Sequence, residues 1–182
     1  MKFLITIIAI IGTMSLFGQK TISIPKVDKN TIEVKNDAII YGNFIQRLGF
    51  SSGGFPQDIR LQNVETNQIL TLRVKPTFQS KKENIMCFKI PKGEYIIHSY
   101  WWTKSKWYGG KVHDEPIYKV SNSKPIERFR FLIKEDKIYY IGTWDFDKSI
   151  VTFKNEKDNF DKLFKSKYKK LKVKNSEIVI PE

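Results

Sequence analysis

Residues 100–111 bring aromatic and cationic side chains together in one short stretch. The segment holds three of the four tryptophans of the chain, with two tyrosines and three lysines. Exposed rings beside cations suit stacking on sugar rings, cation–π contacts or anchoring at an envelope interface. The candidate ligand-binding residues are Trp102, Lys104, Lys106, Trp107, Tyr108 and Lys111. The alternative is that these rings fold back over the open end of the domain.

The orientation of these rings depends on which side chains of the segment point inward and which point outward. In a strand, successive side chains point to opposite faces. Alternation that continues from Tyr95 and Ile97 places Trp101 inward and Trp102 outward. Trp107 and Tyr108 then fall at a loop tip.

A second candidate surface is basic and lies near the C-terminal end of the sequence. Residues 154–174 carry nine lysines against three acidic residues, a net charge of +6. Apolar residues within 156–171 recur at helical spacing, which predicts an amphipathic helix. Its opposite face supplies four candidate contacts to anionic glycan or lipid head groups: Lys162, Lys165, Lys169 and Lys170. The alternative is a solvated lysine face without a ligand.

Catalytic chemistry has one candidate pair. Cys87 and His98 are expected to face each other across a hairpin, and a thiolate beside an imidazole can act as a nucleophile. Both positions are mid-strand, however, and no third orienting group or oxyanion loop accompanies them. The alternative is a half-buried cysteine beside a hydrogen-bonded histidine. We therefore assign no catalytic residues and expect no enzyme, with a hydrolase as the remaining enzymatic alternative.

The sequence shows no pattern typical of a metal site or a cofactor site. His113-Asp114-Glu115 offers three possible ligands in a row, but neighbours in an extended segment point to opposite faces. The spacing typical of zinc sites is missing. The glycine pairs 53–54 and 109–110 lie between expected strands and do not open a helix, as a phosphate loop would. We expect no metal site and no cofactor.

The first 19 residues predict a secretory signal peptide. Lys2 is followed by the apolar run 3–11 and then by small residues, which is the order of such signals. Cleavage after Gly18 fits this pattern. The competing interpretation is an uncleaved anchor, although the uncharged run 3–19 is at the short limit for spanning a membrane. We expect an exported protein, periplasmic or extracellular, with no transmembrane anchor after cleavage.

The amino-acid composition limits the classes of partner that we expect for this protein. The net charge is +13, and the cations are 27 lysines against only five arginines. Base recognition relies on the bidentate fork of arginine, so nucleic acid is not an expected partner. Cys87 is the only cysteine, which excludes an internal disulfide and a lipid anchor at the cleavage region. An anionic envelope surface remains a possible partner.

The remaining pattern between residues 21 and 152 has the period of strands. It predicts strands at 21–24, 31–34, 38–48 (with a bulge or close backbone approach at Gly42) and 149–153. Three hairpins are also expected, and their paired segments are 59–64 with 69–74, 85–90 with 95–102, and 126–133 with 138–143. The sequence thus favours an all-β, antiparallel β-sandwich of about eight or nine strands with one C-terminal amphipathic helix.

Two segments carry a family resemblance. Residues 88–96 read Phe-Lys-Ile-Pro-Lys-Gly-Glu-Tyr-Ile, and residues 131–142 read Phe-Leu-Ile-Lys-Glu-Asp-Lys-Ile-Tyr-Tyr-Ile-Gly. The first is similar to the apolar-Pro-x-Gly-x-Tyr hairpin of transthyretin-like (prealbumin-like) modules of exported bacterial proteins. The second is similar to the closing hairpin of such modules, with Glu135-Asp136 where a glycine is common. The resemblance implies a β-sandwich with a role in binding, scaffolding or envelope assembly, and it carries over no catalytic residues.

The expected organisation is a signal peptide over 1–19, a sandwich over 20–153, and a helix and tail over 154–182 that pack on it. The expected function is a non-enzymatic binding or structural module of the bacterial envelope. Its ligand would be a glycan or another anionic envelope component held by residues 100–111. The alternative is a protein-interaction component of an envelope complex.

Overall fold

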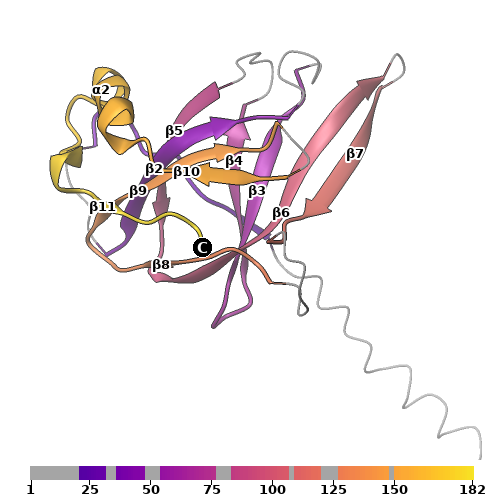
Figure 1. The fold of residues 1–182 in the computed structure, drawn as a ribbon, viewed down its shortest axis with the longest axis horizontal. Coiled ribbons are helices and arrows are strands. Elements are labelled where there is room, and N and C mark those ends of the chain that lie inside the picture. The colour runs from indigo at the N-terminus through magenta and orange to yellow at the C-terminus, as the bar shows by residue number, and fades with distance from the viewer. Residues whose placement is uncertain are drawn as a thin grey trace, which may run out of the picture.

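The computed structural model describes residues 21–31, 36–47, 54–76, 83–106, 109–119, 127–147 and 150–182. The expected signal peptide, the strand at 31–34 beyond its first residue, and the loop tip at 107–108 lie outside these ranges. The described residues form two β-sheets and one α-helix (Figure 1).

The first sheet has the strand order β1-β4-β3-β6-β7, and β8 also pairs with β6. Its strands are β1 (Thr21–Ser23), β3 (Gln57–Asn63), β4 (Ile69–Lys75), β6 (Gly93–Lys106), β7 (Gly109–Pro116) and β8 (Arg130–Ile133). The second sheet has the order β10-β9-β2-β5, and β11 also pairs with β9. Its strands are β2 (Ala38–Ile45), β5 (Glu83–Ile90), β9 (Ile138–Asp145), β10 (Thr152–Lys154) and β11 (Glu177–Ile178).

Both sheets are mixed, so the expectation of a purely antiparallel fold is wrong. β1 pairs in parallel with β4, β2 with β9, and β11 with β9. The eleven described strands exceed the expected eight or nine. β7 was not expected, because its residues Gly-Gly-Lys-Val-His-Asp-Glu-Pro show no apolar alternation, and the two residues of β11 are too few to show any.

The main hydrophobic core receives side chains from both sheets. Phe44 of β2 and Phe88 of β5 belong to the same buried cluster as Leu61 of β3, Leu72 of β4 and Ile97 of β6. Trp144 of β9 is fully buried among these residues and meets Phe44 and Phe131 edge-on. The second sheet therefore buries one whole face against the first.

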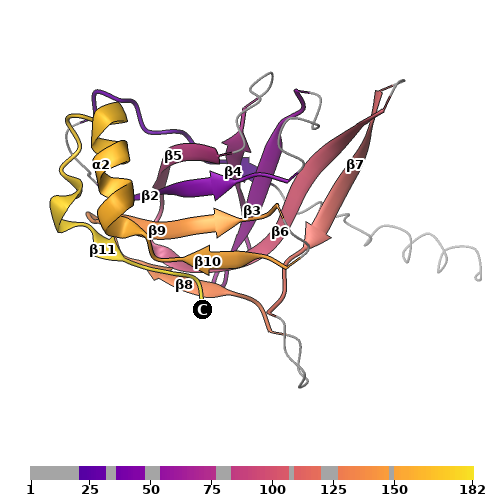
Figure 2. The same cartoon turned by 45° about the horizontal axis from the view of Figure 1, so that its top comes forward.

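One end of the other face of the second sheet is covered by the helix α2 (Lys157–Lys167), as Figure 2 shows. Phe160 and Phe164 of α2 lie against Tyr41 of β2 and Tyr140 of β9 in a second buried cluster. Burial on both faces explains why β2 and β9 are almost continuously apolar, which is typical of parallel strands. The predicted C-terminal helix is confirmed, although it ends at Lys167 rather than near Leu171.

The hairpin expected at residues 59–64 and 69–74 is confirmed as β3 and β4, which pair antiparallel. The side chain of Asn63 forms the turn, because its Oδ1 accepts hydrogen bonds from the backbone N–H groups of Glu65 and Thr66 at 3.0 and 2.9 Å. Asn67 has a positive φ of 57°, which asparagine tolerates better than most residues.

The other two expected hairpins are wrong. β5 and β6 follow one another through Pro91-Lys92, but β5 pairs with β2 in the second sheet and β6 with β3 in the first. In the same way, β8 pairs with β6 whereas β9 pairs with β2. Each connection thus carries the chain from one sheet to the other. Both strands still turn their apolar residues to the shared core, which is why alternation alone favoured a hairpin.

The irregularity expected at Gly42 is confirmed. The register between β2 and β9 shifts between Tyr41 and Asn43. A Cβ atom on Gly42 would lie 2.6 Å from the carbonyl oxygen of Gly142 on the neighbouring strand. Glycine at this position therefore permits a backbone approach that a larger residue would block.

Candidate functional site

Cys87 and His98 do not form a catalytic pair. Cys87 is fully buried in the cluster beneath α2, and burial raises the pKa of its thiol well above the ordinary value. His98 lies on β6 in the other sheet, where Nδ1 is 3.2 Å from the Ser99 hydroxyl. Burial and the nearby Arg128 lower the pKa of His98. Because the two strands are in different sheets, the predicted cross-strand contact does not exist.

The acidic residues of the His113-Asp114-Glu115 run each have a cationic partner. Asp114 pairs with Arg60 of β3, and Glu115 Oε2 lies 2.8 Å from Arg47 Nη1. Among the residues that the structure describes, no group of three or more histidine, cysteine or acidic side chains is placed to hold a metal ion.

Trp102 points inward, which contradicts the predicted orientation. Its side chain is only 6 % exposed, and its Nε1 donates to Glu115 Oε1 at 3.1 Å. The ring stacks on His113 with centroids 4.2 Å apart. The physical reason is a β-bulge in β6: Arg60 pairs with Ser99 and Leu61 with Ile97, so His98 is an extra residue. Such a bulge reverses the alternation beyond it.

The rest of the predicted aromatic loop is only partly described. Lys104 and Lys111 are cross-strand partners on β6 and β7, and both are exposed. Trp107 and Tyr108 lie outside the described residues, and so does the side chain of Lys106. The described part of the loop is therefore a pair of adjacent cations beside a buried tryptophan.

The second predicted surface forms a depression where the chain turns back after α2. It has a volume of about 490 Å³ and is lined by Lys165, Lys169, Leu171, Lys172, Val173, Lys174 and Asn175. We call it the lysine hollow. Leu171 and Val173 are buried in the cluster beneath α2 and form its apolar floor, whereas the four lysines are exposed.

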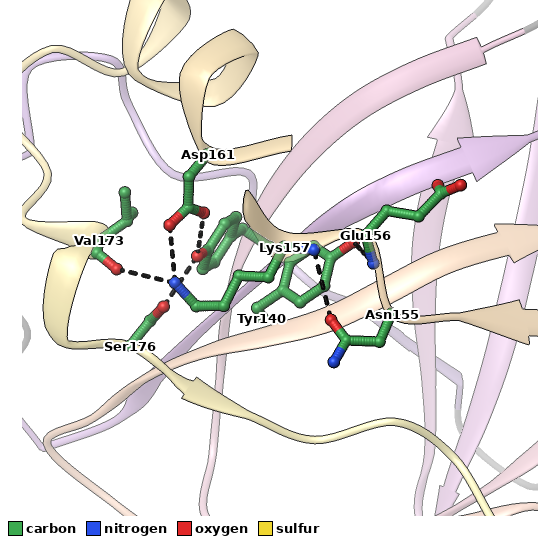
Figure 3. Close-up of polar contacts among 8 residues, drawn as sticks. Tyr140, Asn155, Glu156, Lys157, Asp161, Val173 and Ser176 are labelled. Carbon is green, nitrogen blue, oxygen red and sulfur yellow. Dashed lines mark hydrogen bonds and ion pairs between the residues drawn. The ribbon is translucent and has the colours of Figure 1, made fainter. Parts of the chain in front are cut away.

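A buried polar network holds the turn against the helix (Figure 3). Asp161 of α2 accepts hydrogen bonds from the Tyr41 hydroxyl at 2.7 Å and from Lys157 Nζ at 2.6 Å. Lys157 Nζ also reaches the carbonyl oxygen of Val173 at 3.4 Å. The Ser176 hydroxyl lies 2.8 Å from that of Tyr41. These contacts fix the 3-10 turn η2 (Val173–Asn175) relative to α2 and so set the positions of the lysines around the hollow.

The charge in the hollow is not neutralised. None of Lys165, Lys169, Lys172 and Lys174 forms an ion pair or a side-chain hydrogen bond with another residue in the described ranges, and no acidic residue lines the hollow. The arginines differ in this respect, since four of them form ion pairs: Arg47 with Glu115, Arg60 with Asp114, Arg73 with Asp58 and Arg130 with Glu94. Much of the positive charge that has no acidic partner is therefore carried by lysines such as those of the hollow.

The sequence predicted only part of this site. Lys165 and Lys169 line the hollow, whereas Lys162 and Lys170 are exposed but do not line it. Lys172 and Lys174 follow the residues with helical spacing, so the predicted basic helix face does not include them. Their signal is the alternation of Leu171 and Val173 with lysines, which is typical of a segment with one buried face.

Comparison of the chain with known protein-family models, with curated proteins and with solved structures finds no match. Within the described ranges, no helix has the length and apolar character needed to cross a membrane. The function must therefore be inferred from the chemistry of the protein surface.

Proposed function

We propose that this chain is an exported, non-enzymatic binding module of the bacterial envelope, and that the lysine hollow holds its anionic ligand. The observation that carries the proposal is the hollow itself, in which four unpaired lysines surround an apolar floor. Flexible ammonium groups around a depression suit phosphate or carboxylate groups presented on a surface.

The hydrogen bonds that fix the backbone around the hollow support the same proposal. The network of Tyr41, Asp161 and Lys157 is largely buried, so α2 and η2 keep their spacing without a ligand. A site whose backbone is already fixed loses less conformational freedom on binding. The last turn of α2 also carries Lys165 and Lys167, whose charge complements the negative end of the helix dipole.

The test is binding of the chain to two anionic probes, phosphatidylglycerol vesicles and a soluble polyuronate, with phosphatidylcholine vesicles as the neutral control. We expect binding to at least one anionic probe and none to the neutral vesicles. Replacing Lys172 and Lys174 with glutamate should weaken binding about 30-fold or more, since each lysine near an anionic surface contributes about 1 kcal/mol.

The matched control replaces Lys134 and Lys154, which are exposed elsewhere, with glutamate. This variant has the same net charge as the hollow variant but keeps the hollow intact. We expect its affinity to fall far less. An equal loss in the two variants, or no binding to either anionic probe, would rule out the hollow as the site.

A further inference from the structure

Among the described strands, one edge differs from the others because it is long and no other described segment pairs with it. A sheet edge exposes a row of unpaired N–H and C=O groups, and proteins usually shorten or cover such edges. In the second sheet, the edge strand β5 is covered by an earlier segment: Val27 N donates to Cys87 O at 2.9 Å, and Lys89 N donates to Pro25 O at 3.1 Å. On the opposite side, β10 and β11 have three and two residues.

The first sheet has the same protection at most of its edges. β1 has only three residues. The outer side of β8 is closed by the tail, because Arg130 N donates to Glu182 O at 2.8 Å and Glu182 N donates to Arg130 O at 3.1 Å. β7 is the exception, since its eight residues pair with β6 on one side and with no other described strand on the second.

The β7 edge is also sterically accessible. The β6–β7 ribbon extends away from the rest of the fold at the end opposite α2, and Figures 1 and 2 agree on this. Val112 in the middle of β7 is 55 % exposed. In both views β7 is the outermost described strand at this side of the first sheet.

The charges of β7 are self-complementary. The strand reads Gly-Gly-Lys-Val-His-Asp-Glu-Pro, so its cation precedes its two acids. Two identical strands related by a two-fold axis perpendicular to the sheet run antiparallel, and side chains opposite each other then share a face. This restricts partners to positions of the same parity. When His113 faces its own copy, Lys111 of each chain lies opposite Glu115 of the other, so that each Glu115 carboxylate lies between Arg47 of its own chain and Lys111 of the second copy.

We propose that β7 pairs antiparallel with β7 of a second copy of this chain, in the register that places Lys111 opposite Glu115 of the second copy. The first sheets of the two copies then form one continuous sheet. An edge of eight residues buries less area than a stable interface needs, so the dimer is weak and depends on concentration. This inference is independent of the proposed function, because the hollow and β7 lie at opposite ends of the fold.

Sedimentation velocity over a range of concentrations tests the dimer. The native chain should shift reversibly from monomer to dimer, and Lys111→Glu should weaken the dimer about tenfold by placing like charges opposite each other. Lys104→Glu is the matched control, because Lys104 is the cross-strand neighbour of Lys111 but lies on the inner strand. It should change the dissociation constant much less. A monomer at every concentration, or equal losses in both variants, would overturn the proposal.

The register has its own test that does not depend on affinity. In His113→Cys, the two new thiols face each other across the two-fold axis, within the Cα separation that a disulfide requires. Oxidation should yield a covalent dimer, whereas Leu132→Cys on β8, where the side chain is 54 % exposed and so more accessible than that of His113, should remain monomeric. If Leu132→Cys cross-links as readily as His113→Cys, the register is wrong.

Discussion

The Tyr41 hydroxyl donates a hydrogen bond of 2.7 Å to Asp161 Oδ1, and this bond joins a central strand of the second sheet to the helix that covers it. Asp161 also receives Lys157 on its other oxygen at 2.6 Å. Tyr41 therefore anchors the same carboxylate that fixes the turn beside the lysine hollow.

Tyr41→Phe should destabilise the protein by about 1–3 kcal/mol, because it leaves a largely buried carboxylate without one of its donors. Urea unfolding followed by circular dichroism measures the change. Tyr118→Phe is the control, since Tyr118 is 42 % exposed, and its loss should stay within about 0.5 kcal/mol. Equal stabilities of the native chain and Tyr41→Phe would contradict the role given to this bond.

Alkaline pH should weaken the fold through its buried tyrosines. Burial and the bond to Asp161 raise the pKa of Tyr41, and burial raises the pKa of Tyr168 to about 12. A raised pKa in the folded state stabilises the protein fully below the unfolded value of about 10, and this contribution is lost as the pH rises through the folded pKa. Stability should therefore fall above pH of about 10.

Tyrosinate absorbance measured alongside circular dichroism checks this expectation. The buried tyrosines should ionise late, together with the loss of the native spectrum. Ionisation of all the tyrosines near their ordinary pKa, with a native spectrum retained, would show that Tyr41 and Tyr168 are not protected.

Two glycines with similar φ angles allow the cost of steric crowding to be measured apart from the cost of backbone strain. Gly142 and Gly109 have φ values of 96° and 94°. A Cβ atom at Gly142 would lie 2.8 Å from the carbonyl oxygen of Lys154, whereas at Gly109 it meets no described atom within 4 Å. Gly142→Ala should therefore cost about 1–3 kcal/mol more than Gly109→Ala, the usual range for overpacking. Equal costs in urea unfolding would mean that backbone strain alone decides both.

The attachment of α2 can be tested with two neighbouring residues. Phe164 is fully buried against Tyr41, whereas Leu163 is 60 % exposed. Phe164→Ala should cost about 3–5 kcal/mol of stability, and Leu163→Ala should cost less than about 0.5 kcal/mol. Both changes are measured by urea unfolding. Similar losses at the two positions would mean that α2 does not pack by the face described.

Cys87 reports on the same contact by its reactivity. In the native chain the Cys87 thiol is buried and its pKa is raised. A disulfide reagent should therefore react with it no faster than the structure around Cys87 opens. Phe164→Ala should accelerate this reaction by loosening α2, and Leu163→Ala should not. Rapid labelling of native Cys87 would show that the helix does not seal this face.

The sequence predicted which residues are buried better than it predicted which strands pair. The expected hairpin of 85–90 with 95–102 would place Phe88 and Ile97 in one sheet, but they lie in the main core on opposite sheets. Alternation reports only that a side chain faces the core. It does not distinguish a hairpin from a connection that crosses between two sheets facing each other.

The candidate site shows a similar division. The bulge at His98 inverted the expected orientation of Trp102, and no single residue type marks such a bulge in advance. The basic character of residues 154–174 was visible, and two of the four lysines expected on the basic face, Lys165 and Lys169, line the hollow. The hollow itself could not be predicted, since it depends on η2 returning to α2 through Lys157 and Asp161.

The parallel pairing of β11 with β9 has a consequence for the order of folding. Glu177 and Ile178 align with Tyr139 and Tyr140, and Ile39 of β2 aligns with Ile138 of β9. Contacts between segments so distant in sequence form slowly, because a long loop must close before they contribute. The second sheet therefore combines pairings over long sequence separations, and it is expected to form more slowly than the local β3–β4 hairpin of the first sheet.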